Sequence, residues 1–344
     1  MDQNPGDGLV QKAAAVGVAS AYVSDDLAAA LFPKSGINLS DRMLSNGLQY
    51  LRAIIREIEI EICMIAAEEF GLKHDIIIEI GNSGRGHSYA LLQSAGLLES
   101  KNLLEYVFTC IQRVELGTRL LQKISQADLE SVLIRHLDCE DAVIADAAMA
   151  LLVAQSRDNG GSGLIHAHIS NLPADILFAL TWPITAALQK LSGYEGQELI
   201  KAAEKLLGGH DEGAAIQSRA RRLAQLVDHI AGSAESPHPL HDGVDLFLAR
   251  LAQRSGLSVD QLILFTAEPK MMRLVLAMRA MDISTDHALS IFGALDGSGQ
   301  MLTPASYNEI DVDRASELVS QWSGNGLLQD AQRKLNTHFS GLSV

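Results

Sequence analysis

SDRMLSNGLQYLRAIIREIEIEICMIAAEEFG, residues 40–71, is the stretch that decides the fold of this chain. Its apolar residues recur at alternating steps of four and three, which is the spacing of one face of an α-helix. They are Leu44, Leu48, Leu51, Ile55, Ile58, Ile62 and Ile65. Ser40 is suited to cap the start of this helix and Gly71 to end it. The stretch predicts one helix over 41–70 whose apolar seam packs either in the core or against a second copy of the chain.

Two segments of this region also have features of strands. "EIEIEI" (57–62) alternates strictly between acidic and apolar residues, but it lies inside the longer helical pattern and is predicted to be helix. "DIIIEI" (75–80) is rich in isoleucine, and its period alone does not distinguish helix from strand. Ile54 and Ile60 lie off the seam and are expected to widen the apolar face of the helix.

The composition favours helices and a large core. Of the 344 residues, 47% are hydrophobic and 20% are charged, which excludes a mostly disordered chain. Aromatic residues make up only 5%, while alanine, leucine and isoleucine abound, as is typical of close-packed helices. The formal charge of −15 repels polyphosphates and anionic lipids. The sequence therefore predicts an all-α protein with neither a nucleic-acid nor a membrane partner.

Several features indicate a reducing, cytoplasmic location. The start, "MDQNPGDGLVQK", has no basic segment of the kind that begins a signal peptide, and no apolar run reaches the roughly 18 residues of a membrane span. Cys63, Cys110 and Cys139 are far apart and form no C-x-x-C pair. They are interpreted as small buried hydrophobes and not as disulfide or zinc ligands.

Paired leucines indicate a helical repeat. The pairs Leu91/Leu92, Leu120/Leu121 and Leu151/Leu152 are spaced by 29 and 31 residues. Helix–turn–helix units of about this length are typical of HEAT-like solenoids, although a plain helical bundle gives such pairs by coincidence. The loop "GSAESPHPLHDG" (232–243) is interpreted as a linker. The predicted division is N-terminal helices over 1–39, a HEAT-like domain over 40–231 and a second helical domain over 244–344.

Three stretches together resemble a known bacterial family. They are "LSDRMLSNGLQYLRAIIREIEIEI", "SYALLQSAGLLESKNLLEYV" and "FLARLAQRSGLSVDQLILFTAEPKMMRLVLAMRAMDIS". The chain resembles, over residues 40–320, the alphaproteobacterial family called domain of unknown function 2336. The resemblance implies a helical fold with HEAT-like units, favours helix over strand at 75–80, and implies no catalytic residues because the family carries no established activity.

The sharpest chemical motif is "GNSGRGHS", residues 81–88. Gly81, Gly86 and Ser88 match the glycine and hydroxyl positions of a phosphate-binding loop, with Ser88 as a magnesium ligand. His87 stands where the motif requires lysine, and a histidine has neither the reach nor the permanent charge of lysine. The loop is interpreted as a turn between helices, with a nucleotide-binding switch or enzyme as the alternative.

A second motif resembles a DNA-binding helix-turn-helix over 251–268. Ala252, Gly256 at the turn and Ser258 as an N-cap fit the pattern. The helix that would enter the major groove contains Asp260 and Glu268 but no arginine or lysine. A tight pair of packed helices is the favoured interpretation, and a DNA-binding regulator is the alternative.

The remaining polar groups do not form a recognisable site. The histidine clusters lack the i, i+4 spacing of a zinc-binding helix; they are His166 with His168, His210 with Asp211 and Glu212, and His238 with His241 and Asp242. A calcium-like loop that begins at Asp296 lacks too many ligands. The basic cluster of Arg219, Arg221 and Arg222 is interpreted as a solvated face that pairs with nearby acids, with a dock for an acidic partner as the alternative.

The sequence thus predicts no catalytic, cofactor-binding or metal-binding residue. The predicted function is that of a non-enzymatic scaffold, adaptor or regulatory module that binds an unidentified protein partner. A homodimer through helix 41–70 is a further expectation.

Overall fold

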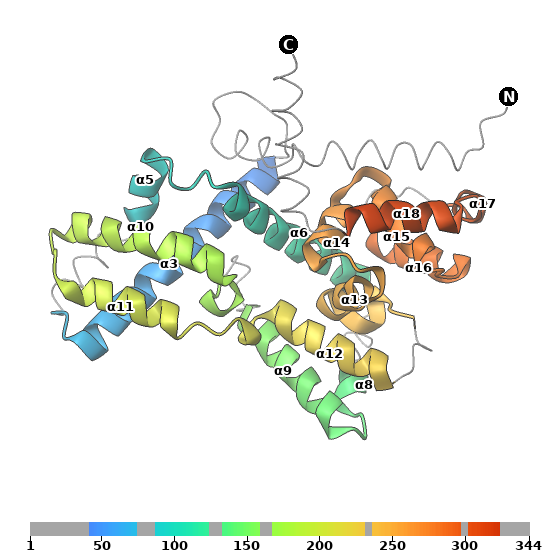
Figure 1. The fold of residues 1–344 in the computed structure, drawn as a ribbon, viewed down its shortest axis with the longest axis horizontal. Coiled ribbons are helices and arrows are strands. Elements are labelled where there is room, and N and C mark those ends of the chain that lie inside the picture. The colour runs from blue at the N-terminus through green and yellow to red at the C-terminus, as the bar shows by residue number, and fades with distance from the viewer. Residues whose placement is uncertain are drawn as a thin grey trace, which may run out of the picture. The chain divides into compact units, whose positions relative to one another are not determined.

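The computed structural model of the protein describes residues 41–73, 87–123, 133–158, 167–230, 236–296 and 302–323. Within these ranges the chain forms fourteen α-helices, three short 3₁₀ helices and no strand (Figure 1). The prediction of an all-α protein is therefore confirmed. None of the described helices is both long enough and apolar enough to cross a membrane.

The described residues divide into two compact units whose segments alternate along the chain. The α3 unit takes its residues from the parts of the chain up to Ile111 and between Ala145 and Ala220. The α13 unit takes its residues from the parts between Gln112 and Ile144 and from Arg221 onward. The predicted division into domains over 1–39, 40–231 and 244–344 stays a prediction.

The α3 unit is built around its longest helix. Its helices are α3 (Asp41–Phe70), α5 (His87–Ser94), the first half of α6 (Lys101–Lys123), most of α9 (Ala142–Asp158), η2 (Ile169–Asn171), α10 (Ala174–Ser192), α11 (Gln197–Gly208), η3 (Glu212–Ala214) and the start of α12 (Ile216–Ile230). In Figure 1, α10 and α11 lie along each other and α3 crosses them, and the three helices are in mutual contact.

The predicted helix 41–70 is α3, with the bounds that the sequence indicated. "EIEIEI" lies inside it, so the helical interpretation of 57–62 is confirmed, whereas 75–80 and Ser40 lie outside the described residues. Gly71 adopts a left-handed conformation with φ of 72°, which a residue without Cβ adopts without strain. The N–H of Leu72 then turns back to donate to the Ala66 carbonyl at 3.0 Å. The helix therefore ends at Phe70, directly before the glycine that was predicted to end it.

The seam of α3 is a core face of its own unit. Its central members are fully buried, namely Leu51, Ile55, Ile58 and Ile62. They pack with apolar residues of α10 and α11 in one cluster. Ile54 is also buried, as expected, but Ile60 is 43% exposed, so the prediction that Ile60 widens the apolar face was wrong. Ile60 lies two residues beyond Ile58, and two residues turn a helix by about 200°, which places Ile60 on the far side.

The α13 unit contains the second half of α6, α8 (Ile134–Leu137), most of α12, α13 (Pro239–Ser255), α14 (Val259–Ala267), η4 (Pro269–Met271), α15 (Met272–Ala280), α16 (Thr285–Leu295), α17 (Pro304–Asn308) and α18 (Val312–Trp322). A second core cluster joins α13 to α14, α15, α16 and α18. Tyr307 is fully buried there and donates its hydroxyl hydrogen to the Ile283 carbonyl at 2.9 Å. This unit positions the polar network described below.

The structure corrects the interpretation of 232–243 as a linker. Residues 236–243 are described, and Pro239 begins α13 instead of belonging to an open loop. His238 and Asp242 are both buried. Proline and glycine mark a loop in most sequences, but proline also fits the first turn of a helix, where its missing N–H has no partner to lose.

The structure does not confirm a HEAT-like repeat. Helix α6 runs without a break from Lys101 to Lys123, so two helices expected in successive repeat units are one helix. The leucine pairs also occupy different places, in the eight-residue α5, at the end of α6 and in the middle of α9. Equal spacing in the sequence therefore does not correspond to equal positions in repeated helix pairs.

Candidate functional site

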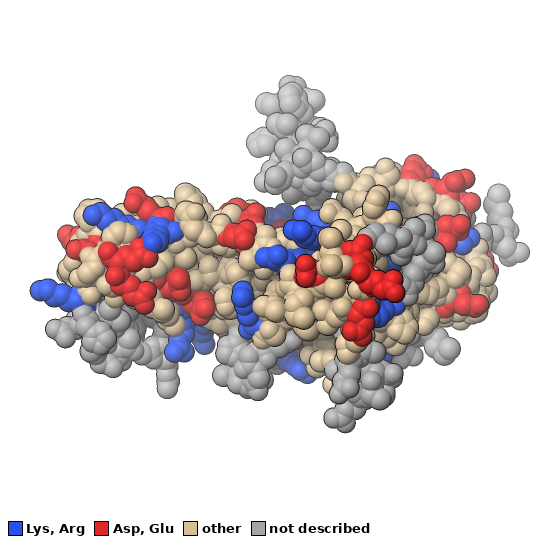
Figure 2. All heavy atoms as spheres, turned by 90° about the horizontal axis from the view of Figure 1, so that it is seen from below, with Lys and Arg blue, Asp and Glu red and all other residues tan. Residues whose placement is uncertain are grey.

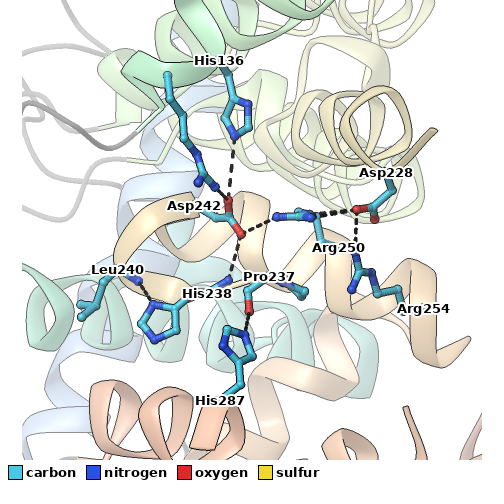
Figure 3. A network of polar contacts seen from close by, with 10 residues as sticks. His136, Asp228, Pro237, His238, Leu240, Asp242, Arg250, Arg254 and His287 are labelled. Carbon is cyan, nitrogen blue, oxygen red and sulfur yellow. Dashed lines mark hydrogen bonds and ion pairs between the residues drawn. The ribbon is translucent and has the colours of Figure 1, made fainter. Parts of the chain in front are cut away.

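The most concentrated polar chemistry in the described structure is a buried network around Asp242 in the α13 unit (Figure 3). Asp242 lies in the first turn of α13 and is almost fully buried. Its Oδ1 accepts a hydrogen bond from Arg135 Nη2 at 2.5 Å, and its Oδ2 accepts from Arg250 Nη1 at 3.0 Å and from the backbone N–H of His238 at 3.1 Å. His136 Nε2 lies 3.8 Å from Oδ1. One carboxylate thus joins α8 to both ends of α13.

Arg250 extends this network to α12. Its side chain has no exposed surface. Its Nε and Nη2 donate to Asp228 Oδ1 at 3.1 and 3.0 Å, and Arg254 Nη2 donates to the same oxygen at 3.0 Å. A guanidinium with five donors in a fixed plane suits this bridging position between two carboxylates. The pairing matters because an unpaired buried charge costs several kcal/mol.

The charges determine the protonation state of Asp242. Burial by itself raises the pKa of this carboxyl, but the nearby His136 ring, the positive charges of Arg250 and Arg135 and the His238 N–H together hold the pKa below its usual value. Asp242 therefore stays ionised at neutral pH and acts as an anchor for the arginines. It does not act as a proton donor there.

His238 caps the start of α13. Its Nδ1 accepts the backbone N–H of Leu240 at 3.3 Å, so the neutral ring carries its proton on Nε2, which lies 3.0 Å from Ser290 Oγ. Two further histidine rings face it, with ring centres 5.1 Å away for His241 and 5.5 Å away for His287. His287 Nε2 donates to the Pro237 carbonyl at 3.0 Å.

The surroundings of His238 oppose its protonation. Burial, together with the neighbouring His241 and His287, lowers its pKa to about 4, and Asp242 opposes the change only in part. Protonation of Nδ1 would also remove the acceptor that caps α13. Because the folded-state pKa lies below that of an unfolded histidine, the contribution of His238 to stability is complete above about pH 6.5 and is lost as the pH falls toward 4.

We expect His238→Asn to reduce the acid sensitivity of the α13 unit. An asparagine side chain also accepts an N-cap hydrogen bond but takes up no proton in this range. The parent should lose on the order of 1–2 kcal/mol between pH 7 and pH 5, seen as a fall of several degrees in the melting temperature. The variant should lose clearly less. His229→Asn, at an exposed histidine of α12, is the matched control and should keep the parent's pH dependence. Equal losses in parent and His238→Asn would contradict this assignment.

The network is a structural clamp and not an open active site. Its carboxylates and guanidinium groups bind one another, and no group of three or more histidine, cysteine, aspartate or glutamate side chains in the described ranges is arranged to hold a metal ion. His238, His241 and Asp242 were predicted from the sequence to be loop residues, and no sequence pattern pointed to Arg250. The one sequence signal was the His238-Pro239 pair, which fits the start of a helix as well as a linker.

The described part of the phosphate-loop motif does not favour phosphate binding. Residues 81–86 lie outside the described residues, and α5 begins at His87. The backbone N–H of Ser88 donates to the Glu59 carboxylate at 3.1 Å, and Ser88 is fully buried. A carboxylate of the protein itself therefore binds the helix N-terminus at which a phosphate would bind. The negative charge of Glu59 would repel that phosphate.

The helix-turn-helix segment has the predicted local geometry. Gly256 is left-handed with φ of 72°, and Ser258 and Gln261 form a reciprocal capping box at the start of α14. The apolar side of α14 lies in the core, and Gln261 Nε2 donates to the Trp322 carbonyl at 2.9 Å. With Asp260 on the exposed side and no cation on the helix, α14 lacks the donors that read a major groove. The alternative of a DNA-binding regulator is therefore less favoured.

The other predicted polar groups lie apart and serve local structure. His210 Nε2 donates to the Leu172 carbonyl at 2.9 Å, Asp211 caps η3, and Glu212 accepts the Ala174 N–H at 2.6 Å. His168 Nδ1 lies 3.0 Å from Ser170 Oγ, and His166 lies outside the described residues. These contacts explain the polar residues as turn and cap partners.

The basic cluster on α12 differs from its interpretation. Arg221 and Arg222 are exposed and Arg219 is half-buried, but none of the ion pairs within the described ranges involves them, so the expected pairing with nearby acids is absent there. On the face drawn in Figure 2, lysine and arginine side chains are interspersed with aspartate and glutamate. A strong cationic surface of the kind that binds nucleic acid is not seen on that face.

An apolar patch on α9 was not found from the sequence. Met149 is 51% exposed, and Leu152 and Val153 are exposed as well. Their i, i+3, i+4 spacing places them together, and we call these three residues the α9 patch. The opposite, buried side of the helix consists of Ile144, Ala147, Ala148, Leu151 and Ala154. Large apolar residues that are exposed together on one side of a helix indicate a surface for another molecule.

Comparisons with family models, with curated proteins and with solved structures find no match for this chain. The resemblance to the family called domain of unknown function 2336 stays a prediction from the three stretches that carry it.

Proposed function

We propose that this chain is a non-enzymatic helical interaction module, a scaffold, adaptor or regulatory protein of the bacterial cytoplasm. The observation that carries the proposal is the α9 patch, where Met149, Leu152 and Val153 are exposed together on one side of the helix. A large aliphatic side chain contributes roughly 1.5–3 kcal/mol when it passes from full exposure to full burial. The three residues of the α9 patch are about half exposed, so each contributes roughly half of that on binding.

The partner that fits this patch is an amphipathic helix with basic flanks. An apolar stripe at i, i+3 and i+4 receives the matching stripe of another helix. The formal charge of −15 attracts a basic segment and raises its association rate. The same charge disfavours polyphosphate ligands, in agreement with the contact of Glu59 at the start of α5. The proposal therefore specifies a protein partner.

The test compares three forms of the full chain as bait in extracts of the native host. The double variant Met149→Glu/Val153→Glu should capture at least about 10-fold less partner than the parent, because it places two charges in the contact. Leu121→Glu introduces one such charge at an exposed leucine of α6 and should capture as much as the parent. Cross-links from the patch should map to a basic amphipathic segment. Equal capture by all three baits would overturn the proposal.

A further inference from the structure

Helix α10 carries a second exposed apolar face, separate from the α9 patch. Its buried side belongs to the core of the α3 unit through Ile176, Leu177, Leu180, Ile184 and Leu188. The fourteen residues from Ile176 to Gln189 include no charged residue, so the outward side is uncharged between Asp175 and Lys190. We call the outward residues Asp175, Phe178, Ala179, Trp182, Ala186 and Lys190 the α10 face.

The centre of the α10 face is aromatic. Phe178 is 58% exposed, and its ring packs edge-to-face on Trp182 with 6.5 Å between the ring centres. Packing on Trp182 restricts the rotamers of Phe178, so little further side-chain entropy is lost on binding. Exposed Ala179 and Ala186 flank the pair, and their small side chains allow another helix to approach closely.

The hydroxyls on this helix do not compete for a ligand. Thr181 and Thr185 are buried, and their Oγ1 atoms donate to the carbonyls of Leu177 and Thr181 at 2.7 and 2.8 Å. The α10 face therefore offers apolar contact at its centre, with one charge near each end.

Those charges are of opposite sign and symmetric about the centre. Asp175 lies in the first turn and Lys190 in the last turn of α10, and both are exposed. Neither takes part in an ion pair within the described ranges. The midpoint of their positions falls between Trp182 and Pro183. An antiparallel copy of the same helix, centred there, brings each Asp175 opposite the Lys190 of the other copy.

We infer that the α10 face binds a second copy of this chain, with the two α10 helices antiparallel about the point between Trp182 and Pro183. A two-fold axis requires a self-complementary surface, which the aromatic centre and the opposite end charges supply. Ala179 of each copy then lies opposite Ala186 of the other, and the Phe178 ring packs beside this close approach. One helix pair buries less area than a standard interface, so a dimer with a dissociation constant on the order of micromolar is expected. The inference does not depend on the α9 patch or its partner.

The first test measures mass against concentration for the full chain, by sedimentation velocity from about 1 to about 200 μM, a range that brackets a micromolar constant. Phe178→Glu should raise the dimer dissociation constant at least about 100-fold, since it introduces one charge per copy at the centre. Leu191→Glu changes an exposed leucine that lies off the α10 face on the same helix and should leave the constant unchanged. Both variants should keep the parent's melting temperature as monomers.

The second test is specific to the antiparallel arrangement. Asp175→Lys places a lysine opposite Lys190 of the other copy at each end of the helix pair. The two like charges should weaken the dimer by several-fold. Adding Lys190→Asp exchanges the charges and should restore the parent's constant, because each new lysine again faces an aspartate. A parent that stays monomeric throughout, a dimer that survives Phe178→Glu, or a double charge variant that is no tighter than the single one would overturn the inference.

Discussion

Replacing Arg250 with alanine is expected to destabilise the α13 unit by about 3 kcal/mol or more. Arg250 has no exposed surface and binds both Asp228 and Asp242. Its loss removes one positive charge from beside two buried carboxylates. Arg254 still contacts Asp228, and Arg135 still contacts Asp242. A domain is stable by only about 5–15 kcal/mol in total, so one such change removes a large part of the stability.

Thermal and urea unfolding of the full chain measures this effect. The matched control is Arg314→Ala, which removes an arginine from an exposed ion pair with Glu317 on α18. Exposed pairs contribute roughly 0–1 kcal/mol, so the control should unfold close to the parent. If Arg250→Ala were as stable as Arg314→Ala, the network would not be a structural clamp.

The second large effect is expected at Ile58, in the middle of the α3 seam. Ile58→Glu places a carboxylate among fully buried aliphatic side chains of α3, α10 and α11. The cost of an unpaired buried charge, added to the lost apolar burial, should exceed about 4 kcal/mol and unfold the α3 unit. Ile60→Glu makes the same change two residues away on the exposed side of the same helix. It should alter stability by less than about 0.5 kcal/mol.

Light scattering on these two variants also tests the expectation of a homodimer through helix 41–70. Unfolding of Ile58→Glu supports the seam as a core face, as the burial of Leu51, Ile55 and Ile62 indicates. A parent dimer that becomes a folded monomer in Ile58→Glu would instead support an intermolecular seam. A variant as stable and as associated as the parent would contradict both interpretations.

Most of what the sequence predicted correctly is local. The bounds of α3, its end at Gly71 and the turn at Gly256 followed from period, caps and backbone freedom. These signals act within one or two helical turns, so they are readable without knowledge of the partners. The helical outcome of "EIEIEI" was predictable for the same reason, because the longer period outweighs a short alternation.

Local sequence patterns did not predict which sides of the helices are buried, and they did not predict the polar network. Helix geometry places Ile58 and Ile60 on opposite sides of α3, but which of the two sides is covered depends on where α10 and α11 lie against α3. The partners Arg135 and Asp242 are 107 residues apart in the chain, and no local pattern joins them. Likewise, the exposure of Phe178 and Met149 depends on which faces the fold leaves uncovered.

The sequence by itself determined that this chain is helical and where the long helix α3 begins and ends. Backbone hydrogen bonds, caps and the spacing of apolar residues act over a few residues, and the order of the residues specifies them directly. Only the tertiary structure decided that Asp242 and Arg250 form a buried clamp and that α9 and α10 leave apolar faces uncovered. Burial and ion pairing depend on distances between segments far apart in the chain, and these distances exist only in the folded protein.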